Sequence, residues 1–93
     1  MNPNLKTDMA REAEKVMQEC LELLDKKQQD YGSGNITIIG ELGVLMRTLE
    51  KTERLKHLLT TKGNPNNETI EDSWKDIVNY AVIAILVRRD LWK

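Results

Sequence analysis

Hydrophobic residues recur at helical spacing along the first third of the chain. Over residues 5–29 apolar side chains fall three or four positions apart, whereas charged residues such as Arg11 and Glu22 fall elsewhere. This pattern predicts an amphipathic helix. The polar segment after Gln29 ends it, and Gly32 is a good residue to cap it. The apolar face carries Met9, Ala13, Val16, Met17, Cys20 and Leu24.

A second helix is predicted from Ile36 to about Leu59. Its first residues, 36–40, are β-prone, but so short a segment without a partner strand does not make a sheet. Gly40 and Gly43 each cost about 1 kcal/mol of helix stability relative to alanine. Two explanations for them remain open, namely close packing and the approach of a ligand to the backbone. The apolar stripe of this helix is Leu42, Leu45, Leu49, Thr52 and Leu59.

A third helix is predicted after a polar loop at residues 60–67. It begins near Thr69, where Thr69 and Asp72 resemble a capping box, and ends near Leu91. Two of its faces carry apolar residues, and three helices cannot readily cover both. We therefore expect a dimer or a larger homo-oligomer. The face expected to be plain core carries Ile70, Trp74, Ile77, Val78, Ala81, Ala84 and Ile85, and the second carries Asp72, Asp76, Asn79, Tyr80, Ile83 and Val87.

Acidic residues form one pair on each of the last two predicted helices. Asp72 lies in the first turn, where it opposes the helix dipole, but Asp76 lies beyond that turn and requires a cationic group nearby. Glu50 and Glu53 lie three residues apart on the preceding helix. An antiparallel hairpin would bring the two pairs together, and four carboxylates would favour a hard divalent cation such as Mg²⁺. The alternative is a solvated face with local ion pairs, such as Glu50 with Arg54.

Composition narrows the functional classes. The chain has 93 residues, 14 Lys and Arg, 15 Asp and Glu, and a formal net charge of −1. We therefore expect one domain over residues 1–93 and no strong nucleic-acid binding. Single Cys and His residues are too few for a zinc site, and His57 is expected at the surface. Cys20 lies on an apolar stripe and is expected to be a buried structural thiol.

The chain shows no signal peptide and no apolar run of the roughly 20 residues that would span a membrane. The expected location is therefore cytoplasmic, with no membrane partner.

The acidic motifs resemble those of the all-α, MazG-like nucleoside triphosphate pyrophosphatases. Residues 50–53 match the Glu-x-x-Glu motif of that superfamily in full. Asp76 matches the last residue of the second motif, Glu-x-x-Asp, whereas Ser73 stands at its first position and Asp72 is the nearest acid. A closer resemblance is to the phage-associated nucleotide-modification-associated domain. It rests on residues 27–32, 43–55 and 71–81.

This resemblance implies an all-α fold of three helices, in which an antiparallel helical hairpin assembles into an oligomeric helical bundle. It also implies a nucleotide ligand and, for a phage protein, a host cytoplasmic location. Mg²⁺ held by Glu50, Glu53, Asp72 and Asp76 would neutralise a triphosphate, and Glu53 would orient the attacking water. The residues implied to contact the nucleotide are Lys26, Lys27, Asp30, Tyr31, Arg47, Lys51, Arg54, Asn79 and Tyr80.

Three functions stay open on this basis. The first is an Mg²⁺-dependent pyrophosphatase acting on nucleotides, modified ones included. The second is a nucleotide-binding protein without catalysis, such as a phage-encoded sponge for signalling nucleotides. The third is a structural helical oligomer.

Overall fold

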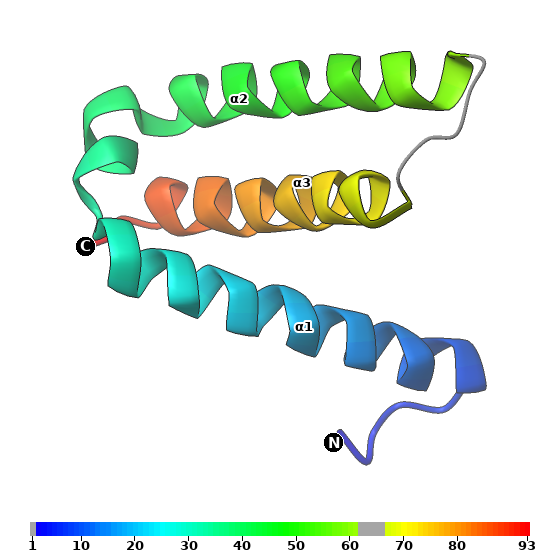
Figure 1. The fold of residues 1–93 in the computed structure, drawn as a ribbon. Coiled ribbons are helices and arrows are strands. Elements are labelled where there is room, and N and C mark those ends of the chain that lie inside the picture. Colours follow the sequence, from blue (N-terminus) through cyan, green and yellow to red (C-terminus); the bar gives the residue numbers. More distant parts are fainter. Residues whose placement is uncertain (1, 62–66) are drawn as a thin grey trace.

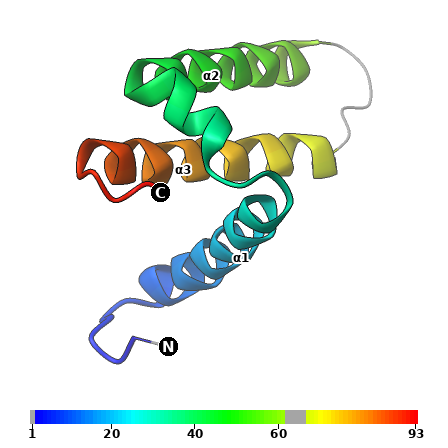
Figure 2. The same cartoon turned by 90° about the vertical axis from the view of Figure 1, so that its left-hand side faces the viewer.

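The computed structural model describes residues 2–61 and 67–93, which form three helices and no strand. These are α1 (Asp8–Tyr31), α2 (Gly34–Thr60) and α3 (Asn67–Arg88). Helices α2 and α3 lie side by side and antiparallel, while α1 approaches α3 near its own C-terminal end and diverges toward its N-terminus (Figure 1; Figure 2). The predicted all-α chain with an antiparallel hairpin is confirmed.

The two ends of α1 are fixed by local hydrogen bonds. The side chain of Thr7 accepts a hydrogen bond from the backbone N–H of Ala10 at 3.0 Å, so the helix begins three residues later than predicted. Gly32 caps the other end with a φ of 67°, and its N–H donates to the carbonyl of Gln28 at 2.8 Å. The predicted role of Gly32 is thus confirmed.

Helix α2 contains a kink at Gly40. This residue has φ 64° and ψ −168°, a conformation that glycine adopts readily and other residues avoid. At Gly43 a Cβ atom would lie 2.3 Å from the Cβ of Ile39. Packing within the kinked helix therefore explains Gly43. Residues 36–39 are helical as predicted, and the helix is interrupted at Gly40.

The ends of α3 differ from the prediction. The helix begins at Asn67, and Thr69 lies inside it with its carbonyl accepting a hydrogen bond from Ser73. The predicted capping box at Thr69 and Asp72 is therefore wrong. The helix ends at Arg88 rather than near Leu91, because Asp90 adopts a φ of 58° and turns the chain. Most of the predicted loop, residues 62–66, lies outside the described residues.

The buried face of α3 is the one that carries Asn79 and Ile83. Ile83 packs with Ile36 and Val44 in the core. Trp74, Val78, Ala81 and Ile85, which were predicted to be plain core, are exposed. The reason is that α1 and α2 both pack on the face that carries Asp76, Asn79 and Ile83. The polar side chains of that face bind groups of α1 and α2. Among the helices described, none is long and apolar enough to cross a membrane.

Candidate functional site

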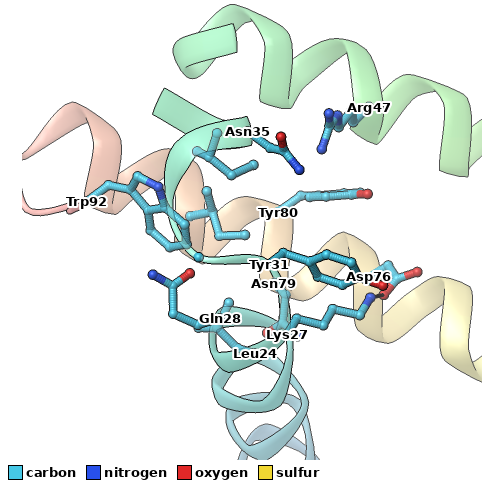
Figure 3. Close-up of a pocket in the computed structure, with 13 residues that line it drawn as sticks. Leu24, Lys27, Gln28, Tyr31, Asn35, Arg47, Asp76, Asn79, Tyr80 and Trp92 are labelled. Carbon is cyan, nitrogen blue, oxygen red and sulfur yellow. Dashed lines mark hydrogen bonds and ion pairs between the residues drawn. The ribbon is translucent and has the colours of Figure 1, made fainter. Parts of the chain in front are cut away.

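A cleft of about 310 Å³ lies where the C-terminal end of α1, the kinked start of α2 and the middle of α3 meet. Its size falls in the range of small-molecule sites. Figure 3 shows Trp92 at one end of the cleft and Asp76 with Lys27 at the other. Its lining combines aromatic rings, amides and charged groups: Tyr31, Tyr80 and Trp92; Gln28, Asn35 and Asn79; Lys27, Arg47 and Asp76.

The C-terminal segment closes one end of this cleft. The indole N–H of Trp92 donates to the carbonyl of Ser33 at 3.1 Å. Gln28 donates to the Ser33 hydroxyl at 2.6 Å, and this hydroxyl donates to the carbonyl of Lys93. The turn between α1 and α2 is thus tied both to α1 and to the chain after α3. These bonds hold the ring of Trp92 against the cleft.

Asn79 joins α3 to α1 in the floor of the cleft. Its side chain is buried, and its amide nitrogen donates to the carbonyl of Cys20 at 3.0 Å. Cys20 is itself buried, as predicted, and burial raises the pKa of its thiol. The Asn79 amide is therefore part of the structure that shapes the cleft.

Asp76 is bound by two lysines from the other two helices. Its Oδ1 lies 2.9 Å from the Nζ of Lys27, and its Oδ2 lies 2.9 Å from the Nζ of Lys51. Burial alone would raise the pKa of Asp76, but the hydrogen bonds and charges of the two lysines outweigh it and lower the pKa below its ordinary 3.8. The prediction that a cationic group lies near Asp76 is confirmed. The group of three carries a net charge of +1.

The predicted acidic quartet does not come together as a metal site within one chain. Glu50, Glu53 and Asp72 are exposed, while both oxygens of Asp76 are bound by lysines. Over residues 2–61 and 67–93, no three His, Cys, Asp or Glu side chains are grouped so that they could hold a metal ion. Ser73, at the first position of the second motif, is buried with its hydroxyl bound to a backbone carbonyl. Within one chain these four carboxylates therefore do not form a Mg²⁺ site, and Mg²⁺ binding by the protein stays a prediction.

Five of the predicted nucleotide contacts line the cleft. Lys51 does not line it but forms an ion pair with Asp76, which does. Lys26 and Asp30 are exposed and lie 4.0 Å from each other. Arg54 is exposed and does not line the cleft. The five that the structure brings together are Lys27, Tyr31, Arg47, Asn79 and Tyr80.

Sequence reasoning missed three polar or aromatic residues of the lining, namely Gln28, Asn35 and Trp92. Gln28 and Asn35 flank the polar segment between the first two helices, and that position was a usable signal. Trp92 lies beyond the last helix, and no periodicity places such a residue in space.

Of the two cationic side chains that line the cleft, Lys27 is bound to Asp76, and Arg47 forms no ion pair with any described residue. It reaches the cleft from α2 and is half-buried (Figure 3). Among the described residues, no carboxylate lies within ion-pair distance of its guanidinium. A guanidinium group can bind a carboxylate or a phosphate through two parallel hydrogen bonds.

Comparison with models of protein families shows to which family the chain belongs. It belongs to the nucleotide modification associated domain 1 family, whose model matches residues 27–87. This stretch includes every lining residue of the cleft except Leu24 and Trp92. Comparisons with curated proteins and with solved structures found no match. The predicted resemblance to this family is confirmed, and its name associates the chain with nucleotides.

Proposed function

We propose that this protein binds a nucleotide in the cleft between α1, α2 and α3. The observation that carries the proposal is the guanidinium of Arg47, which forms no ion pair with any residue that the structure describes, in a cleft of about 310 Å³ that also presents three aromatic rings. A nucleotide needs a cation for its phosphate and a flat apolar surface for its base. The family of the chain supports the same class of ligand.

The phosphate is assigned to the side of the cleft where Arg47, Lys27 and Lys51 supply positive charge. Asp76 balances only one of the two lysines, so these three side chains leave an excess of positive charge on this side of the cleft. Arg47 adds to that excess. Charge-assisted hydrogen bonds to phosphate are about twice as strong as neutral ones. The proposed ligand is therefore held mainly through its phosphate.

The base is assigned to the aromatic part of the cleft. Tyr31 is exposed at the end of α1 and lies on the side of Lys27 and Asp76 in Figure 3, whereas Trp92 lies at the opposite end of the cleft. Stacking on such a ring contributes about 1–3 kcal/mol per base. Asn35 adds an amide that both donates and accepts, which suits the edge of a base.

Calorimetric titration with nucleoside monophosphates, triphosphates and cyclic dinucleotides, and with the parent nucleosides, tests this proposal. We expect at least one nucleotide to bind and its nucleoside to bind more weakly. Arg47→Gln should weaken nucleotide binding by roughly 10- to 100-fold, the equivalent of a lost charged hydrogen bond. The matched control is Arg54→Gln, which removes an arginine of the same helix outside the cleft and should leave the affinity unchanged.

Two results would contradict the proposal. One is that no nucleotide in the series binds the unaltered chain, which would favour the purely structural oligomer. The other is that Arg47→Gln binds as tightly as the unaltered chain.

Hydrolysis with release of pyrophosphate is the second candidate, and the match of residues 50–53 to the Glu-x-x-Glu motif favours it. It would require acidic groups that residues 2–61 and 67–93 of a single chain do not bring together. Pyrophosphate release in the presence of Mg²⁺, abolished by Glu53→Gln, would support it. Binding without release would leave the protein as a nucleotide-binding module.

A further inference from the structure

The side-chain amide of Gln28 is held in one orientation by a chain of hydrogen bonds. The carbonyl oxygen of Lys93 can only accept, so the hydroxyl of Ser33 donates its hydrogen there. That hydroxyl therefore acts as the acceptor for the Nε2 of Gln28, which lies 2.6 Å away. Exchanging the oxygen and the nitrogen of the amide would place two acceptors against each other. The Oε1 of Gln28 is left for another partner, since it forms no hydrogen bond with a described residue.

This oxygen belongs to the end of the cleft that is assigned to the base. Gln28 lines the cleft and is half-buried. In Figure 3 its amide lies next to the ring of Trp92, and its nitrogen is turned away from the middle of the cleft. A base held beside the ring of Trp92 therefore meets a fixed acceptor.

The other hydrogen-bond donors near this end are already used within the chain. The carbonyl of Cys20 can only accept, so the Nδ2 of Asn79 faces it at 3.0 Å. Asn79 lines both the cleft and a neighbouring groove between α1 and α3. The indole N–H of Trp92 donates to the carbonyl of Ser33 at 3.1 Å. Neither fixed amide and not the indole therefore offers a hydrogen to a ligand.

The remaining polar groups of the lining do not discriminate between donors and acceptors. The side chain of Asn35 and the hydroxyl groups of Tyr31 and Tyr80 form no hydrogen bond with a described residue. An amide that is free to turn over and a hydroxyl group can each donate or accept. The fixed acceptor of Gln28 is therefore the group that distinguishes one base from another.

Bases differ in what they present to such an acceptor. Adenine, cytosine and guanine carry an exocyclic amino group, whereas thymine and uracil carry carbonyl oxygens in its place. An amino group projects from the edge of the ring and donates to the oxygen of Gln28. A carbonyl oxygen at the same position would be a second acceptor, and both oxygens would lose the hydrogen bonds that water gives them. The ring N–H of uracil or hypoxanthine lies beside such a carbonyl, which hinders its approach to the acceptor.

We propose that the cleft prefers nucleotides whose base carries an exocyclic amino group, a preference that rests on the nucleotide site proposed above. Gln28 is the residue that determines this specificity through its Oε1. Ser33 is a positioning residue, because its hydroxyl fixes the orientation of the Gln28 amide.

Calorimetric titration of the unaltered chain with matched pairs of nucleotides tests the preference. The pairs are adenosine with inosine and cytidine with uridine, each as the monophosphate, the triphosphate and the cyclic dinucleotide. The members of a pair share sugar and phosphate and differ in an amino group against a carbonyl oxygen. In the pair that binds more tightly, we expect the amino member to bind at least about tenfold more tightly than its partner.

Two substitutions distinguish specificity from a general loosening of the cleft. Gln28→Met removes the acceptor, so the amino member should lose about tenfold in affinity and the preference should disappear. Ser33→Ala lets the amide turn over and donate, so the carbonyl member should gain affinity. A purely structural role would instead lower the affinity of both members alike. The matched control is Gln29→Met, which removes an exposed glutamine of α1 outside the cleft and should leave both affinities unchanged.

Three results would overturn the preference. Equal affinities within every pair that binds would do so and leave the proposed nucleotide site intact. An amino preference that Gln28→Met leaves unchanged would assign the specificity to another group. Absence of binding by every nucleotide would contradict the proposed site itself, and the preference with it. Because the comparison of pairs uses the unaltered chain, it decides the matter even if a variant does not fold.

Discussion

Replacing Asp76 by asparagine removes the charge that holds two helices to α3. In the structure Asp76 binds Lys27 of α1 and Lys51 of α2, each at 2.9 Å. Asparagine keeps the shape of the side chain but can accept from only one of the two ammonium groups. We therefore expect Asp76→Asn to destabilise the fold, and the exposure of the three side chains sets the magnitude.

The side chain of Asp76 is 13% exposed, while those of Lys27 and Lys51 are 49% and 28% exposed. Breaking a fully buried ion pair costs about 3–5 kcal/mol, and an exposed pair contributes about 0–1 kcal/mol. Here the carboxylate is largely buried but both lysines can return to water, so the expected loss is about 2 kcal/mol. For a domain of this size that lowers the melting temperature by roughly 8–16 °C.

Thermal unfolding followed by circular dichroism, in the presence of a metal chelator, measures this loss. The matched control is Asp72→Asn, which removes an exposed carboxylate one turn earlier on the same helix and should change the free energy of unfolding by no more than about 0.5 kcal/mol.

The effect should also depend on pH. The pKa of Asp76 is lower in the folded chain than its ordinary value of 3.8. The ionised carboxylate therefore stabilises the fold fully at a pH above the pKa of the unfolded chain, and this stabilisation is lost as the pH falls through the pKa of the folded chain. The difference between Asp76→Asn and the unaltered chain should therefore shrink below about pH 4. An unchanged or raised melting temperature of Asp76→Asn at neutral pH would refute the reasoning. It would mean that repulsion between acidic groups, as in an empty metal site, dominates at this position.

Two further experiments test the fold. Gly40→Ala places a Cβ at a φ of 64° and should lower the free energy of unfolding, measured in urea, by about 1–2 kcal/mol. The control Gly34→Ala, where a Cβ meets nothing within 4 Å, should leave that free energy unchanged, and equal effects of the two substitutions would argue against the kink. Cys20 is buried with a raised pKa, so a thiol reagent should modify it at least roughly tenfold more slowly in the native chain than in denaturant; equal rates would show that α1 does not stay packed on α3.

The helices, the Gly32 cap and the partner of Asp76 could be predicted because each depends on local spacing or on a simple charge requirement. Cys20 followed from its place on an apolar stripe. These features are decided within one helix or by one buried charge, and periodicity is sufficient for them.

The buried face of α3 could not be predicted in the same way. Both faces carry apolar residues, and the pattern alone does not say which one meets the chain's own helices. The covered face also carries Asn79, whose amide donates a hydrogen bond to the carbonyl of Cys20 across the helix interface. The exposed face, with Trp74 and Ile85, is the one predicted to be core.

Part of the lining of the cleft could be predicted, from the family resemblance rather than from periodicity. Lys27, Tyr31 and Arg47 belong to segments that suggested nucleotide contacts, and all three line it. Trp92 does so because Asp90 turns the chain back toward Ser33, a contact between distant parts of the sequence.

The two tryptophans give the most direct test of the central claim, that a nucleotide binds in the cleft. Trp92 lines the cleft, whereas Trp74 is exposed on α3 and does not line the cleft. In a ¹H–¹⁵N spectrum each indole N–H gives its own signal, and Trp74→Phe assigns them. Titration with the nucleotide that binds in calorimetry should shift the Trp92 signal and leave that of Trp74 in place. A saturating nucleotide that leaves the Trp92 signal unmoved would contradict the account.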